Sequence, residues 1–142
     1  MQTTFFILAK MNFMKLSLFF LFFCCSIFGQ VDYPKDYFRS PLNIPMQLSG
    51  IFGDLRPKHF HAGFDFKTLQ KEGLEVYAVA DGYISRIKIS TFGNGKTIYI
   101  THSNGYTSVY GHLQKANDFI EDFIKKAQYA DQSFEIERYL KP

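Results

Sequence analysis

The sequence predicts an all-β domain built on an antiparallel β-sheet, with one short helix and a separate N-terminal segment. Three observations predict it. β-Rich runs follow one another after residue 75, Asx-Gly pairs separate them, and the apolar period changes from two to that of a helix near residue 117. With 142 residues, 46% hydrophobic and 20% charged, the chain has the length and composition of one globular domain.

Residues 1–30 form a predicted secretory signal peptide. Lys10 and Lys15 precede an uncharged run over residues 16–28, small residues follow near its end, and the segment has no acid. A membrane-spanning helix needs about 20 residues, so this shorter run predicts a cleaved leader and no permanent membrane anchor. The protein is therefore expected to be exported, to the periplasm or the extracellular space. A lipid anchor on Cys24 is the alternative, which the bulky Phe23 before it disfavours.

The part after residue 30 has nearly balanced charge. Without the two lysines of the leader, 14 of the 16 Lys and Arg remain against 13 Asp and Glu, so the net charge falls from +3 to +1. Such a balance gives no clustered basic face for nucleic acid, and no nucleic-acid partner is expected. Both cysteines lie in the leader, so a metal in the exported part would have His, Asp or Glu ligands.

The exported part divides into two regions. Residues 31–47, rich in Pro and aromatic residues, predict an extended lead-in without a regular element, and residues 48–142 predict the sheet domain. Asx-Gly pairs are strong hairpin signals and predict an antiparallel meander. Its β-rich runs are 76–80, 83–90, 96–102 and 106–112, separated by Asp81-Gly82, Asn94-Gly95 and Asn104-Gly105.

Apolar residues alternate along the second run, where Tyr83, Ile87 and Ile89 are expected to share a buried face. Residues 117–129 instead carry apolar residues at helical spacing, with Asn117 as a plausible N-cap. They predict a short helical insertion. No closing strand is expected after residue 135.

His61 and Asp65 are the candidate metal ligands, in the run His59-Phe60-His61-Ala62-Gly63-Phe64-Asp65. In an uninterrupted strand they would lie about 13 Å apart, because each residue adds about 3.3 Å. Zinc needs its ligand atoms about 2 Å away, so the chain must double back, and Ala62-Gly63 permits such a bend. The alternative is that the two side chains only hydrogen-bond to each other at a loop.

His112 is the candidate general acid or base, at the end of the last run in Tyr110-Gly111-His112-Leu113. An imidazole titrates near neutral pH and would serve if the meander brings it beside the His61–Asp65 loop. Capping of a loop is its alternative role. His102 precedes a turn and is expected at the surface, while Asp54 and Asp81 belong to turns and are expected to be structural.

Taken in order, several motifs between residues 48 and 113 resemble the lysostaphin-type (LytM-like) zinc metallopeptidases, peptidase family twenty-three of the metallo class. The motifs are Phe52-Gly53 to Arg56, His61-x-x-x-Asp65, Val76 to Gly82, and Asn104-Gly105-Tyr106 to Leu113. Leu48-Ser49-Gly50 is most similar to exported members from the Bacteroidetes. The resemblance implies a compact antiparallel fold of the duplicated-hybrid-motif or barrel-sandwich kind, with one Zn²⁺ in its groove.

The resemblance also implies that His61 and Asp65 are zinc ligands and that His112 is the catalytic histidine. The implied reaction is hydrolysis of peptide bonds in peptidoglycan stems or cross-bridges. The family's third ligand comes from a His-x-His pair on a late strand, and no such pair follows His112. A catalytic zinc usually has three protein ligands, so we expect a C-terminally incomplete member with closing strands missing. The chain as printed would then lack part of its zinc site, and an inactive chain is one outcome that this absence predicts.

Two other functions remain open from the sequence. A non-catalytic wall-binding or amidase-activating module of the same fold fits the absent third ligand and needs no zinc. Zinc stoichiometry separates it from an endopeptidase. A sugar- or lipoyl-binding β module is the third hypothesis, and it gives His61 and Asp65 no joint role.

Overall fold

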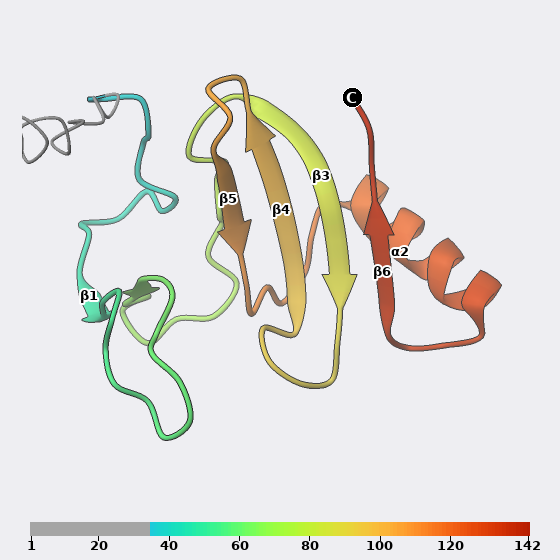
Figure 1. The fold of residues 1–142 in the computed structure, drawn as a ribbon, viewed down its shortest axis with the longest axis horizontal. Helices are drawn as coiled ribbons and strands as arrows, with labels where there is room; N and C mark the ends of the chain where they lie inside the picture. Colours follow the sequence, from blue (N-terminus) through green and yellow to red (C-terminus); the bar gives the residue numbers. More distant parts are fainter. Residues whose placement is uncertain (1–34) are drawn as a thin grey trace, which may run out of the picture. The chain divides into compact units, whose positions relative to one another are not determined.

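Short antiparallel strands and a single helix make up the described part of the chain (Figure 1). The computed structural model describes residues 35–142, so the predicted signal peptide, residues 1–30, lies outside the described residues. The predicted fold class is confirmed: the described residues are mostly β, antiparallel, with one helix and no closed barrel. In order, the elements are β1 (Leu48–Gly50), β2 (Asp65–Phe66), β3 (Gly82–Ile89), β4 (Lys96–His102), β5 (Thr107–Tyr110), α2 (Asp118–Asp131) and β6 (Ile136–Tyr139).

The larger sheet has the strand order β5-β4-β3-β6, and each neighbouring pair is antiparallel. The meander β3-β4-β5 turns at two of the predicted Asx-Gly pairs, where Gly95 and Gly105 have φ of +61° and +84°. Positive φ costs glycine little, so these pairs can close the connections over residues 90–95 and 103–106. The smaller sheet pairs β1 with β2.

The strand predicted over residues 76–80 is wrong, because these residues are irregular in the structure. The Tyr77 N–H donates to Pro41 O at 2.9 Å, and Val79 O accepts from the Arg39 N–H at 2.8 Å. Their partner is thus the lead-in, which has no helix or strand over residues 36–47, as predicted. Pro41 has no N–H to return a hydrogen bond, so this pairing lacks one of its ladder bonds.

β6 corrects the expectation that no strand follows residue 135. It pairs with β3 from Ile89↔Ile136 to Arg86↔Tyr139 and so covers an edge that would otherwise be open. A four-residue strand carries little periodic signal, and its pairing depends on β3 being already in place. The local sequence of residues 136–139 therefore contains no signal that predicts β6.

α2 packs on one face of the sheet, over β3 and β6 (Figure 1). The buried cluster there consists of Ile87, Ile89, Ile124 and Ile136. Ile84 packs against it, whereas Tyr83 is 37% exposed. The register between β3 and β4 shifts between Ile84 and Arg86, so a bulge at Ser85 turns Ile84 rather than Tyr83 toward the core. The prediction for Tyr83 is wrong for that reason.

α2 confirms the predicted helix and extends it by two residues. Asn117 caps the start, where its side-chain oxygen accepts from the Ile120 N–H at 2.9 Å. Gln132 ends the helix in the left-handed conformation, with φ of +50°. Within the described part of the chain, no helix has the length and apolar character needed to cross a bilayer.

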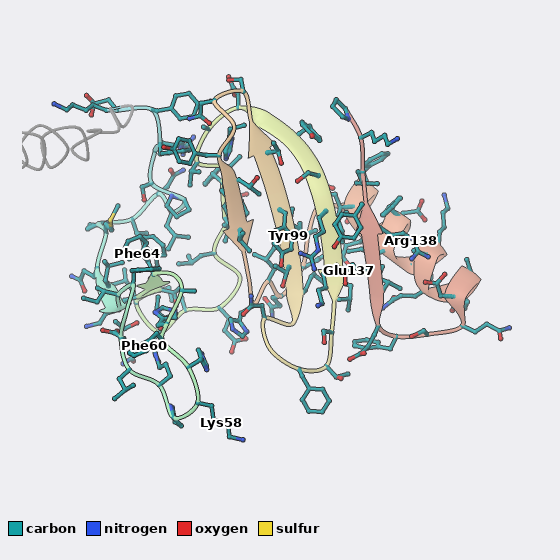
Figure 2. The ribbon with its side chains drawn as sticks, viewed as in Figure 1. Lys58, Phe60, Phe64, Tyr99, Glu137 and Arg138 are labelled. Carbon is teal, nitrogen blue, oxygen red and sulfur yellow. The ribbon has the colours of Figure 1, made fainter. Side chains whose placement is uncertain are left out.

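The sheet face opposite α2 carries polar and aromatic side chains. Arg86 lies between the rings of Tyr99 and Tyr139, with its guanidinium carbon 4.6 and 5.2 Å from their centroids, and pairs with Glu137. Figure 2 shows Tyr99 and Glu137 on this face. Arg138 belongs to the α2 side, where it bonds Asp131 at 2.5 Å and ties β6 to the helix.

We expect Ile87→Ala to lower the free energy of unfolding by about 2–4 kcal/mol, because it opens a cavity in the most buried part of the core. Ile87 is 2% exposed and belongs to the α2-covered cluster. Phe92→Ala, at an 84% exposed position, should change stability by less than about 0.5 kcal/mol. Urea unfolding of both variants checks this, and equal losses would contradict the core described here.

Candidate functional site

A tight loop over residues 51–61 positions the first candidate ligand. The His61 N–H donates to Asp54 O and the Gly53 N–H donates to His61 O, both at 2.8 Å. The Asp54 carboxylate accepts from the Ile51 N–H at 2.8 Å, which confirms the predicted structural role of Asp54. Gly53 has φ of +85°, a conformation that favours glycine. The loop therefore returns His61 to the side of Ile51.

The His61 ring is oriented by a backbone carbonyl. Its Nδ1 lies 3.0 Å from Ile51 O. A carbonyl oxygen only accepts, so Nδ1 is the donor in this contact, and in a neutral ring with that tautomer Nε2 keeps its lone pair. Metal-ligating histidines usually have such an acceptor on their second nitrogen, which fixes tautomer and orientation. Nε2 is thus available to a cation.

The chain bends at Gly63 and brings Asp65 back to His61, as the sequence predicted. Nε2 of His61 lies 3.2 Å from Oδ1 of Asp65. Two zinc ligand atoms in tetrahedral geometry, each about 2.0–2.1 Å from the ion, lie about 3.3 Å apart. The separation therefore fits adjacent corners of a zinc coordination shell.

The second oxygen of Asp65 has its own partner. Asp65 begins β2 and pairs with Gly50 of β1, and its Oδ2 accepts from Nη2 of Arg56 at 2.7 Å. A Cβ on Gly50 would lie 2.4 Å from that oxygen and 2.6 Å from Nη2. The absence of a side chain at residue 50 thus gives the Arg56–Asp65 pair its room.

The donor set around this pair is incomplete for a catalytic metal. Among the described residues, no group of three His, Cys, Asp or Glu side chains could hold a metal ion. The side chains of His61 and Asp65 are 19% and 46% exposed, so the pair is open to solvent and to a substrate. The structure brings together the two predicted ligands and adds no third among residues 35–142.

His112 does not join His61 and Asp65 in a group of three metal ligands among the described residues. Its ring is exposed, and its backbone N–H donates to Asn94 O at 2.8 Å. Its φ is +56°, an uncommon conformation for a residue with a Cβ. Gly111 packs closely on Asn94, where a Cβ would lie 3.2 Å from that side chain. The β3–β4 turn thus holds His112 in a strained backbone conformation.

His102 is buried, at 3% exposure, and the expectation that it lies at the surface is wrong. Its Nδ1 lies 2.8 Å from Asp81 O and its Nε2 lies 2.9 Å from the Ser108 hydroxyl. The ring of Phe38 from the lead-in packs edge-on against it at 5.6 Å. The lead-in therefore covers this end of the sheet, which local sequence around His102 could not reveal. Asp81 has the predicted structural role, through its carbonyl.

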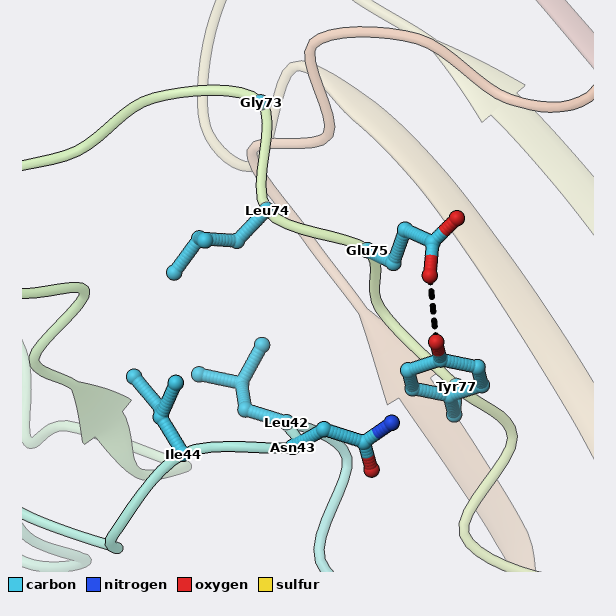
Figure 3. Close-up of a pocket in the computed structure, with 7 residues that line it drawn as sticks. All are labelled: Leu42, Asn43, Ile44, Gly73, Leu74, Glu75 and Tyr77. Carbon is cyan, nitrogen blue, oxygen red and sulfur yellow. Dashed lines mark hydrogen bonds between the residues drawn. The ribbon is translucent and has the colours of Figure 1, made fainter.

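A separate hollow of about 340 Å³ lies between the lead-in and residues 73–77 (Figure 3). Aliphatic side chains of Leu42, Ile44 and Leu74 line it. Its one acidic lining residue, Glu75, hydrogen-bonds the Tyr77 hydroxyl, and this bond raises the pKa of Tyr77 above its usual value. The carboxylate of Glu75 is already hydrogen-bonded, and the residues that line the hollow include no other metal ligand of this kind, so we assign no metal site there.

Exposed apolar side chains flank the His61–Asp65 pair in the chain, and no local pattern in the sequence marks them as functional. Phe60 and Phe64 are 69% and 58% exposed, and Figure 2 shows both on the loop that carries the pair. Phe52 and Leu55 of the same loop are also exposed. Apolar surface gathered in this way is typical of a binding region.

The sequence matches the profile of Peptidase family M23 over residues 59–130, which are 72 of the 142 residues and just over half of the chain. An "Uncharacterized metalloprotease" of Haemophilus influenzae is 33% identical over 89 residues, covering 63% of this chain and 18% of the relative. The "Peptidoglycan DD-endopeptidase ShyC" of Vibrio cholerae is 32% identical over 102 residues, covering 66% of this chain and 22% of the relative. The chain thus spans about a fifth of these relatives' lengths. No solved structure matches it significantly.

The orientation of His61 predicts a specific tautomer. In the zinc-bound chain at pH 8, long-range ¹⁵N–¹H correlation spectra should show Nδ1 protonated and Nε2 unprotonated, because Ile51 O accepts from Nδ1 and the ion takes the lone pair of Nε2. Free histidine prefers the other tautomer, so exposed His59 serves as the internal reference. Protonation of His61 at Nε2 would contradict the site geometry.

Proposed function

The chain belongs to peptidase family M23, and from that premise we propose that it is a zinc-dependent endopeptidase that hydrolyses peptide bonds of peptidoglycan. The observation that carries the proposal is the 3.2 Å approach of Nε2 of His61 to Oδ1 of Asp65, with each group oriented by a further partner. The relative named as a peptidoglycan DD-endopeptidase supports the substrate class. The predicted leader and this substrate together support an exported protein, periplasmic or extracellular.

His61 and Asp65 would hold the zinc ion through Nε2 and Oδ1. Bound zinc supplies a Lewis acid for the scissile carbonyl and lowers the pKa of a coordinated water toward about 7. One neutral and one anionic ligand leave the ion with net positive charge, which this chemistry needs. Ile51 O holds the proton of His61 on Nδ1, and Arg56 holds the other oxygen of Asp65.

His112 is proposed to transfer a proton or to donate a hydrogen bond to the developing oxyanion. Its exposed imidazole is free of a hydrogen-bond partner among the described residues, and its φ of +56° supports a functional role. Residues in such conformations cost free energy and cluster at active sites. Exposed Phe60 and Phe64 would contact the substrate beside the metal ligands.

A non-catalytic wall-binding or amidase-activating module is the second candidate. The observation that favours it is the count of candidate ligands, because the described residues bring only one imidazole and one carboxylate together. A catalytic zinc usually has three protein ligands. A binding module needs no zinc, so the measured stoichiometry separates the two candidates.

We expect the purified chain to bind one Zn²⁺ through His61 and Asp65 and, if two protein ligands suffice for catalysis, to release new amino groups from peptidoglycan in a chelator-sensitive reaction. His61→Ala and Asp65→Asn should abolish both properties, because each removes one ligand. His59→Ala is the matched control, since His59 is exposed and outside the pair, and it should keep both. Metal analysis and mass spectrometry of the released fragments measure these outcomes. Cleavage that persists in His61→Ala would refute zinc-dependent catalysis at this pair. Binding of the chain to peptidoglycan without zinc would favour the second candidate.

His112→Gln separates proton transfer from metal binding. It should lower kcat by about 10²–10⁴-fold, the usual contribution of a general acid or base, and leave zinc affinity unchanged. Parallel measurements of kcat and zinc affinity test this. Unchanged kcat would remove His112 from the proposed mechanism and leave the metal site intact.

A further inference from the structure

We propose that Arg56 is a positioning residue for the metal site, which divides the two oxygens of Asp65 between itself and the ion. The proposal rests on the proposed zinc function, since it assigns Oδ1 to the metal. Arg56 touches neither the ion nor the substrate in this role. It acts through the carboxylate that it holds.

The geometry of the carboxylate carries the argument. Oδ2 accepts from Nη2 of Arg56 at 2.7 Å, while Oδ1 lies 3.2 Å from Nε2 of His61. A carboxylate with no second partner can rotate, or can chelate an ion through both oxygens. With Oδ2 held by a charge-assisted hydrogen bond, Oδ1 alone is presented to His61, and the ligand binds through one oxygen.

Asp65 is the main bonding partner of the Arg56 side chain in the described part of the chain. Its guanidinium makes its one side-chain hydrogen bond within residues 35–142 to Asp65, and its buried Nε has no partner there. The side chains of Arg56 and Asp65 are 37% and 46% exposed, and ion pairs so open to solvent contribute little to stability. Loss of Arg56 should therefore disturb the carboxylate more than the fold.

Backbone hydrogen bonding within the loop fixes the position of the Arg56 main chain. Its N–H donates to His59 O at 2.9 Å, and Leu55 pairs with Phe60 beside it. The same loop thus supplies the zinc ligand His61 and the guanidinium that aims Asp65.

Gly50 gives a second way to disturb the same contact. It lies opposite Asp65 in the β1–β2 pair, and a Cβ there would lie 2.4 Å from Oδ2 and 2.6 Å from Nη2. Gly50→Ala must therefore shift the Arg56–Asp65 pair while leaving every ligand residue in place. No positive φ is required at this position, so backbone strain does not confound the change.

The test compares Arg56→Gln, Arg56→Lys and Gly50→Ala with Lys58→Gln, an exposed charge of the same loop. Chelator competition measures Zn²⁺ affinity in each purified chain. Arg56→Gln and Gly50→Ala should weaken binding about 10–100-fold, the usual effect of losing a group that orients a ligand. Arg56→Lys should recover part of the loss because it restores a cationic donor, and Lys58→Gln should bind as the parent does.

A metal-free readout keeps this proposal separate from the zinc function. The ¹³Cγ shift of Asp65 and the ¹⁵Nε2 shift of His61 in the zinc-free chain should change in Arg56→Gln and stay constant in Lys58→Gln. Parental zinc affinity and parental shifts in Arg56→Gln would overturn the positioning role and leave the zinc function standing. A parent chain that binds no zinc would overturn the zinc function, and the shifts alone would then decide whether Arg56 orients Asp65.

Discussion

The site depends on one constraint: the backbone must reverse within five residues so that an imidazole and a carboxylate face each other. His61 and Asp65 meet this constraint through a bend at Gly63 and reach 3.2 Å between Nε2 and Oδ1. Neither group could hold that position unaided, because each side chain has rotatable bonds that solvent would leave free. Ile51 O fixes the ring, and Arg56 fixes the carboxylate. The resulting pair presents two donor atoms to one point, which is two of the three protein ligands that a catalytic zinc usually has.

The rest of the described structure supplies the scaffold at two levels. Near the pair, β1 and β2 hold Asp65 opposite Gly50, and the loop between them holds His61. Beyond it, the lead-in bonds to residues 77 and 79 and packs Phe38 on buried His102 of β4. These contacts lie within residues 36–142, which form one unit of the chain. The proposed catalytic His112 follows β5 in the same unit, held by the turn between β3 and β4.

The sequence predicted the hairpin turns and the bend before Asp65, because these features depend on residues that are neighbours in the chain. Asn94-Gly95 and Asn104-Gly105 marked both hairpins, since the turns need positive φ. The bend between His61 and Asp65 followed from the distance that one metal ion can span.

Features that depend on distant residues were missed. β6 needs the edge of β3, and burial of His102 needs Phe38 from the lead-in. The bulge at Ser85 exchanges Tyr83 for Ile84 in the core, and one extra residue leaves no mark in an alternating pattern. Arg56 carried no signal either, because its contact with Asp65 arises only when the loop closes.

The most direct measurement of the central claim is the anomalous difference map of a crystal grown with Zn²⁺. We expect a zinc peak within about 2.1 Å of both Nε2 of His61 and Oδ1 of Asp65, with Oδ2 still hydrogen-bonded to Arg56. Zinc bound at other side chains, or a crystal in which His61 and Asp65 point apart, would contradict it.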